Sequence, residues 1–180
     1  GTYFGIAPDD PDQLLLAMNK ALENNDIVLL TGGVSMGDFD FVPEIMKKAG
    51  VEILFSKIAI QPGKPTVFGM KENQAVFGLP GNPVSSFILF EMLVKPFIHH
   101  WMGHQYQPVE LFLPMGVPLL RKKKERKSLI PVRISDGKVF PVAYHGSAHI
   151  NAYTSANAIL IIGIGSEGHQ TGEPAHVRLL

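Results

Sequence analysis

The sequence contains no cysteine, which excludes disulfide bonds, thiolate metal sites and a cysteine nucleophile. Net charge is also lacking: 16 Lys and Arg residues balance 16 Asp and Glu residues, so no overall field attracts nucleic acid or an acidic membrane surface. No apolar run is long enough to cross a bilayer, and the first residues lack the basic and apolar regions of a signal peptide. We therefore expect a cytoplasmic protein that uses neither membrane nor nucleic acid as a partner, and in which any anion site is local.

With 180 residues, 46% of them hydrophobic and 18% charged, the chain can bury one core, or one core and a small second one. Its start is unusual, because residue 1 is Gly rather than Met, and Tyr3–Ala7 has the pattern of the middle of a strand. We therefore expect that a segment upstream of this sequence has been removed.

The first 104 residues alternate between helix and strand patterns. Asp10 is followed by Pro11 and Gln13, which is typical of a helix N-terminus, and apolar residues then recur at helical spacing. The apolar run Ile27–Leu30 suits a strand buried on both faces of a parallel sheet. Further helices are predicted at 41–49 and 83–101, the second apolar nearly all round and therefore buried, and further strands at 52–60, 66–69 and 75–78. This alternation predicts an α/β fold with a doubly wound, mostly parallel sheet.

From Gly103 onward the helical patterns stop and prolines separate short β-rich runs. Strands are predicted at 128–134, 138–143, 158–164 and 175–180, with turns at Asp136–Gly137 and Glu173–Pro174. We place the boundary so that residues 1–104 form the α/β domain and residues 105–180 form a small β-barrel or sandwich domain.

Two loops carry residue types that bind phosphate, and each follows a predicted strand. The first, Thr31–Ser35, has paired glycines, Gly32 and Gly33, which let backbone approach a ligand closely. The second, Leu79–Ser86, is stiffened by two prolines and has Asn82 in position to cap the next helix. In open α/β sheets, ligands bind beyond the carboxyl ends of the strands. Either loop alone is explained by structural needs, but the two together predict a phosphate cradle.

A third loop adds positive charge. Gln61–Pro65 holds Lys64 in a proline-bounded turn, and Lys57 is expected near the same edge. Taken singly, a lysine in a turn is more often a solvated surface residue. Beside the two phosphate-type loops, we predict that these lysines face a bound anion.

The carboxylates near these loops have two interpretations, a structural role as helix caps and a role in chemistry or metal binding. Capping explains Asp10 without any chemistry, and we favour that reading. Asp38 and Asp40 follow the glycine loop, where Asp40 could cap the next helix and Asp38 could face the cleft or bind a hydrated Mg²⁺. For Asp38 and Asp40 the structural and the metal-binding readings stay open.

Two other groups of polar residues have mainly structural readings. His99, His100 and His104 lack an adjoining carboxylate, and Gly103 breaks the helix between them, so metal binding is not favoured. The basic run Arg121–Lys127 has no interleaved aromatic side chains for stacking on bases, so we expect a solvated hairpin or loop. No function is assigned to His145 or His149.

Three motifs, in this order, resemble the third domain of MoeA/gephyrin-type molybdopterin molybdenumtransferases: TGGVSMGDFD at 31–40, QPGKP at 61–65 and LPGNPVS at 79–85. The tail, in which Ser155–Ala158 precedes an apolar strand, is similar to that family's small β-barrel fourth domain. The resemblance covers essentially the whole chain.

This resemblance implies an enzyme of molybdenum cofactor biosynthesis. Such an enzyme inserts molybdate into adenylated molybdopterin in a Mg²⁺-dependent reaction that releases AMP. The residues implied to bind the pterin phosphate and nucleotide are Thr31, Gly32, Gly33, Ser35, Gly63, Pro80, Gly81, Asn82, Pro83 and Ser85. Those implied to be catalytic are Asp10, Asp40, Lys57 and Lys64, and those implied to bind Mg²⁺ are Asp38 and Asp40.

The sequence also departs from the family pattern. Gln61 stands where the family often has Lys or Arg, so one anion contact is expected to be weakened or supplied elsewhere. The family's first two domains, and the acidic strand and helix that open its third, are not in this sequence. Because the family's active cleft is shared across a homodimer, we expect this chain alone to be inactive. The alternatives are a MogA-type molybdopterin adenylyltransferase, which lacks the β-rich tail, and a gephyrin-like scaffold that binds partner peptides.

Overall fold

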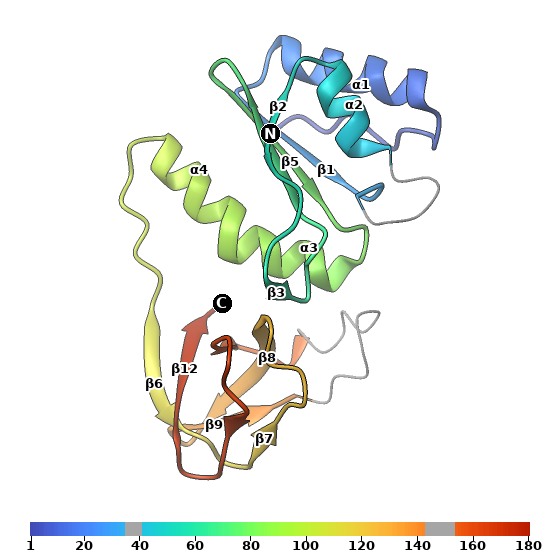
Figure 1. Cartoon of the computed structure of the whole chain (residues 1–180). Helices are drawn as coiled ribbons and strands as arrows, with labels where there is room; N and C mark the ends of the chain where they lie inside the picture. The colour runs from blue at the N-terminus through green and yellow to red at the C-terminus, as the bar shows by residue number, and fades with distance from the viewer. Residues whose placement is uncertain (35–40, 143–153) are drawn as a thin grey trace. The chain divides into compact units, whose positions relative to one another are not determined.

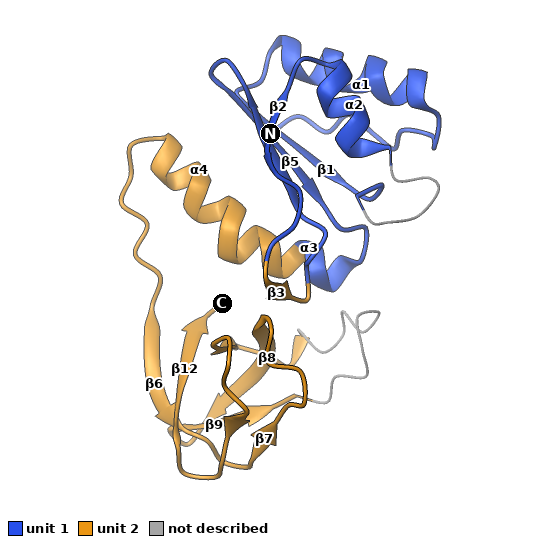
Figure 2. Ribbon diagram, in the orientation of Figure 1, with its two compact units in different colours: residues 1–58, 63–86 blue, residues 59–62, 87–180 orange. Residues whose placement is uncertain are grey.

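The structure is a computed structural model of the chain, and it describes residues 1–34, 41–142 and 154–180. Contacts divide these residues into two compact units, shown in different colours in Figure 2. Unit 1 comprises residues 1–58 and 63–86, and unit 2 comprises residues 59–62 and 87–180. The domain boundary between residues 104 and 105 stays a prediction.

Unit 1 is an α/β unit built on a four-stranded sheet (Figure 1). In chain order it contains α1 (Pro11–Glu23), β1 (Ile27–Thr31), α2 (Val42–Lys48), β2 (Glu52–Phe55), β4 (Val67–Lys71) and β5 (Gln74–Leu79). The strand order is β1-β5-β4-β2. β1 runs parallel to β5, whereas β4 runs antiparallel to both β5 and β2, so the sheet is mixed rather than mostly parallel as expected.

The core of unit 1 lies between one face of this sheet and the two helices α1 and α2. Val28, Val67 and Val76 point to this face from three strands and are at most 7% exposed. They pack in one cluster with residues of the helices, among them Met18 and Met46. Burying such side chains contributes roughly 1.5–3 kcal/mol each. Three phenylalanines pack in tilted pairs on the opposite face: the ring centroid of Phe68 lies 4.6 Å from that of Phe77 and 5.5 Å from that of Phe55.

The N-terminus of α1 is capped as the sequence predicts. The Asp10 side chain accepts a hydrogen bond of 2.8 Å from the backbone N–H of Gln13, and Pro11 occupies the first helical position. At the other end, the Gln74 side chain donates 2.9 Å to the carbonyl of Asn25 and also bonds to that of Leu22. These bonds connect the end of α1 to the start of β5.

Three expectations for unit 1 are wrong. Tyr3–Ala7 forms no strand, and Tyr3 is 82% exposed. The strand expected at 52–60 ends at Phe55, and Ile60 and Gln61 belong to unit 2, where they pair with Lys127 and Ser128. β1 is not buried on both faces: among the described strands it pairs with β5 alone, and Leu29 is 41% exposed.

The helix expected at 83–101 is interrupted. It consists of α3 (Pro83–Leu89), a π-helical turn labelled η1 (Phe90–Val94) and α4 (Lys95–Trp101). In the turn, the N–H of Lys95 bonds to the carbonyl of Phe90, five residues back. Pro96 has no N–H and its ring would clash with a carbonyl four residues back, so a widened turn accommodates it. Burial is also incomplete, since Trp101 is 39% exposed.

Unit 2 is rich in β-structure. Its strands are β3 (Ile60–Gln61), β6 (Glu110–Pro114), β7 (Leu119–Leu120), β8 (Lys127–Ser135), β9 (Lys138–Pro141), β10 (Ala158–Ile162), β11 (Gly168–His169) and β12 (Pro174–Leu179). Six form a sheet in which β3-β8-β10-β12-β6 are ordered side by side and β9 pairs with β8. β7 and β11 form a separate ribbon. Across the described residues the sheet does not close into a barrel, and its core includes Met115, Val132 and Leu160.

Two loops of unit 2 test sequence expectations. The β8–β9 hairpin turns at Asp136 and Gly137, both with positive φ, so the predicted turn is confirmed. The basic run connects β7 to β8, but Arg121 is not solvated as expected. Its guanidinium donates to the carbonyls of Ser166 (2.9 Å), Arg126 (2.6 Å) and Gly163, and to the Ser128 hydroxyl (2.6 Å).

No helix in the described ranges is long and apolar enough to cross a membrane.

Candidate functional site

The strand directions of unit 1 bring four chain segments to one edge of its sheet. Thr31, the last residue of β1, is paired with Leu79, the last of β5. Val67, the first residue of β4, is paired with Gly78, and Phe68 with Phe55, the last of β2. Because β4 runs opposite to its neighbours, the segment before β4 shares this edge with the segments after β1, β2 and β5. These segments contain the predicted glycine loops and both predicted lysines.

The two glycine loops meet at this edge. The N–H of Gly32 donates a 2.9 Å hydrogen bond to the carbonyl of Leu79. A Cβ atom added to Gly81 would lie 3.2 Å from the Cα of Gly32, so the two backbones approach as closely as bare glycines allow. Gly32 and Gly33 also have φ values of +98° and +61°, in the left-handed region that favours glycine. The predicted meeting of the loops is therefore found.

The loop after β5 is held by its own side chains. Asn82 caps α3 as predicted: its side-chain oxygen accepts 3.1 Å from the Ser85 N–H and 3.3 Å from the Ser85 hydroxyl. The Ser86 hydroxyl bonds to the carbonyls of Pro80 and Asn82. Gly81 and Pro83 are exposed at this rim, whereas Pro80 and Ser85 are buried. The hydroxyls thus fix the loop and leave its rim backbone accessible.

The turn that carries Lys64 is fixed by three hydrogen bonds. The hydroxyl of Thr66 donates 2.6 Å to the carbonyl of Gly63. The carbonyl of Lys64 accepts 3.0 Å from the N–H of Ile58 and 3.0 Å from that of Thr66. The Lys64 side chain is exposed, as is that of Lys57, and neither forms an ion pair within the described part of the chain. Thr66, which is fully buried, was not among the predicted site residues.

The predicted carboxylates divide into two groups. Asp10 acts as the helix cap that its sequence context favours. Asp38 and Asp40 lie outside the described residues, as does Ser35, and their roles stay predictions. Phe41 occupies the N-cap position of α2 and makes no side-chain capping bond.

Shifted pKa values are found in ion pairs at the surface. Hydrogen bonding and charge in the Glu44–Lys48 pair lower the pKa of the carboxyl and raise that of the ammonium. At Glu110, burial acts to raise the pKa, but hydrogen bonds from Arg178 (2.6 and 2.8 Å) and His176 (2.7 Å) outweigh it and lower the pKa. These pairs are structural.

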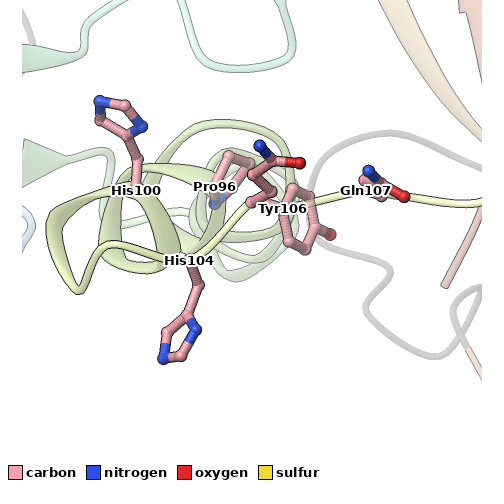
Figure 3. Close-up of a pocket in the computed structure, with 6 residues that line it drawn as sticks. Pro96, His100, His104, Tyr106 and Gln107 are labelled. Carbon is pink, nitrogen blue, oxygen red and sulfur yellow. The ribbon is translucent and has the colours of Figure 1, made fainter.

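A cavity of ≈ 420 Å³ lies in unit 2, where α4 ends (Figure 3). It is lined by Pro96, His100, His104, Gln105, Tyr106 and Gln107, none of which was a predicted site residue. The side chains of His100 and His104 extend in different directions in Figure 3. Residues 1–34, 41–142 and 154–180 contain no group of three His, Asp or Glu that could hold a metal ion.

Residues 2–100 match the family model described as a probable molybdopterin binding domain, which spans unit 1 and its loop edge. The chain belongs to this molybdopterin-binding family. Residues 119–180 match the model of the MoeA C-terminal region (domain IV), which lies in the β-rich unit 2. The predicted resemblance to MoeA-type proteins is therefore confirmed, and the domain IV match disfavours the MogA-type alternative.

Relatives support the same family. The chain is 32% identical over 183 residues to the molybdopterin molybdenumtransferase of Bacillus subtilis (strain 168), covering 99% of this chain and 42% of the relative. It is 32% identical over 182 residues to that of Staphylococcus aureus (strain Mu50), covering 95% of this chain and 42% of the relative. The chain thus spans less than half the length of these relatives.

Solved structures agree with the fold. The chain is similar to the MoeA protein from Pyrococcus horikosii with a TM-score of 0.83 and 27% identity, covering 99% of this chain and 43% of that one. A molybdenum cofactor biosynthesis protein from Pyrococcus furiosus gives a TM-score of 0.78 and 28% identity, covering 98% of this chain and 57% of that one. The predicted α/β fold followed by a β-rich part is confirmed.

Proposed function

We propose that the chain supplies the pterin-phosphate site of a molybdopterin molybdenumtransferase. The whole enzyme would insert molybdate into adenylated molybdopterin and release AMP, in the cytoplasm. The observation that carries this proposal is the contact between the loops at Gly32 and Gly81, beside the turn of Lys64 and on the sheet edge that belongs to the matched family domain.

The chemistry of this edge suits a phosphorylated ligand. Glycine backbone at the rim lets an anion reach main-chain N–H groups without obstruction by side chains. Lys57 and Lys64 add exposed ammonium groups that no described carboxylate neutralises. Since the chain as a whole has no net charge, this local arrangement would have to supply the attraction for an anion.

Mg²⁺ is the finer part of the proposal. The ion prefers carboxylate and water oxygens, and the residues proposed for it, Asp38 and Asp40, lie outside the described residues. The described ranges offer no cluster of three His, Asp or Glu that would replace them. We therefore derive no step through Mg²⁺; when bound, it would polarise the phosphoryl group of the adenylate.

We also propose that turnover needs more than this chain. The relatives are more than twice as long, and a cleft shared across a homodimer would leave the chain able to bind molybdopterin but unable to insert molybdenum. A gephyrin-like scaffold role stays a prediction.

Titration of purified molybdopterin into the 180-residue chain tests the binding part. We expect saturable binding that weakens with added salt, and no molybdate-dependent AMP release from adenylated molybdopterin. The Bacillus subtilis relative is the positive control for both measurements. If that relative binds molybdopterin and the chain does not, the proposed function is wrong; AMP release by the chain alone would disprove the need for a longer protein.

A further inference from the structure

We propose that Thr66 is a positioning residue that holds the Lys64 turn in place for the bound anion, an inference that rests on the proposed function. Thr66 is fully buried, so its hydroxyl cannot contact the ligand from solvent. Its effect on binding must therefore pass through the turn that it stabilises.

The contacts of Thr66 fix the turn on both sides of Lys64. Its hydroxyl donates 2.6 Å to the carbonyl of Gly63, which precedes the lysine, and its N–H donates 3.0 Å to the carbonyl of Lys64 itself. That second carbonyl also accepts from the N–H of Ile58, in the segment that carries Lys57. The main chain at Lys64 is thus fixed while its side chain stays exposed.

The location of Thr66 explains why this matters for the site. Thr66 directly precedes Val67, which is paired with Gly78 of β5, and the Gly81 loop begins just beyond Gly78. Gly63 has a φ of +114° and is buried, so its carbonyl depends on a protein partner. Without the Thr66 hydroxyl this carbonyl loses that partner, and the turn is free to shift the ammonium away from the glycine loops.

Two substitutions separate the hydroxyl from the shape of the side chain. Thr66→Val keeps the volume and removes the donor, whereas Thr66→Ser keeps the donor and removes a methyl group. We expect Thr66→Val to weaken molybdopterin binding by about tenfold, the effect of losing one buried hydrogen bond, and Thr66→Ser to stay within about threefold of wild type. Should Thr66→Val not fold, Thr66→Ser against Thr66→Cys makes the same comparison, since a thiol is a weak donor.

Coupling to Lys64 distinguishes positioning from a general loss of stability. In a Lys64→Gln background the ammonium is already absent, so adding Thr66→Val should change binding by less than about twofold. Thr66→Val alone should also flatten the salt dependence of binding as Lys64→Gln does. A merely structural role would weaken binding equally in both backgrounds and leave its salt dependence unchanged.

The outcomes separate this inference from the proposed function. If Lys64→Gln binds molybdopterin like wild type, the role proposed for the lysine is wrong. If Lys64→Gln weakens binding and Thr66→Val, or Thr66→Cys against Thr66→Ser, makes no difference, the positioning role of Thr66 is wrong. An equal loss from Thr66→Val with and without Lys64 would also overturn it.

Discussion

At the loop edge of the unit 1 sheet, the close approach of Gly81 to Gly32 predicts the effect of adding one methyl group. In Gly81→Ala the new Cβ would lie 3.2 Å from the Cα and 3.7 Å from the N of Gly32. Both neighbours are backbone atoms, and Gly32 is held by its bond to Leu79, so no flexible side chain can move aside. The loops must separate by a few tenths of an ångström.

The magnitude follows from two opposing effects. Overpacking costs about 1–3 kcal/mol. Gly81 does not have a positive φ, so replacing it with Ala also stabilises the chain by about 0.4–1 kcal/mol through the unfolded state. We therefore expect a net loss of about 1 kcal/mol in the free energy of unfolding, with a clear loss of molybdopterin affinity.

Gly163→Ala is the matched control, because Gly163 lies in unit 2, has no positive φ and has no atom within 4 Å of an added Cβ. Urea denaturation followed by circular dichroism gives stability, and calorimetric titration with molybdopterin gives affinity. Gly163→Ala should be neutral or slightly stabilising and should bind normally. If Gly81→Ala matches this control in both stability and molybdopterin affinity, the contact between the two loops contributes to neither.

Three further predictions concern single interactions. Arg121→Met should lower the free energy of unfolding by about 2–4 kcal/mol, because four acceptors lose a charged donor. The control is Lys122→Met at the exposed neighbouring position, which should change the free energy of unfolding by less than about 0.5 kcal/mol. Equal shifts of the melting temperature in the two variants would contradict this prediction. Asn82→Ala should cost about 1 kcal/mol in urea denaturation through loss of the cap, and Asn82→Asp should restore most of it, so failure of Asp to rescue would rule out capping. Burial acts to raise the pKa of Glu110, but its interactions with Arg178 and His176 lower it overall. The stabilising contribution of Glu110 is therefore complete above its unfolded pKa near 4.5 and is lost as the pH falls through the lower folded pKa. Glu110→Gln should make the urea midpoint vary less with pH across that range, and a pH profile identical to that of wild type would refute this.

Short-range signals made part of the molecule predictable from sequence. The Asp10 cap and the Asp136–Gly137 turn each depend on a few adjacent residues whose backbone preferences agree. The glycine loops were predictable for the same reason, since each directly follows a strand. Their meeting at one edge followed from the general rule for open α/β sheets.

Features that depend on distant partners were not predictable in this way. The strand expected at 52–60 ends at Phe55, whereas Ile60 pairs with Lys127, a partner far along the chain. Arg121 looked like one member of a solvated basic run, because its acceptors at Gly163 and Ser166 are about forty residues away. Thr66 is a different case: its partner is only three residues away, but the bond depends on a turn geometry that composition does not reveal.

Because β4 and β5 are antiparallel and joined by a tight turn, that turn lies at the edge of the unit 1 sheet opposite to the glycine loops. This opposite edge carries the tight turn at Glu72 and Asn73, which are exposed, together with the Gln74 bonds to the end of α1. A fluorophore or affinity tag inserted between Glu72 and Asn73 would therefore sit a full strand length from the glycine loops. That turn is therefore a suitable attachment point for a reporter in tests of the proposed molybdopterin binding.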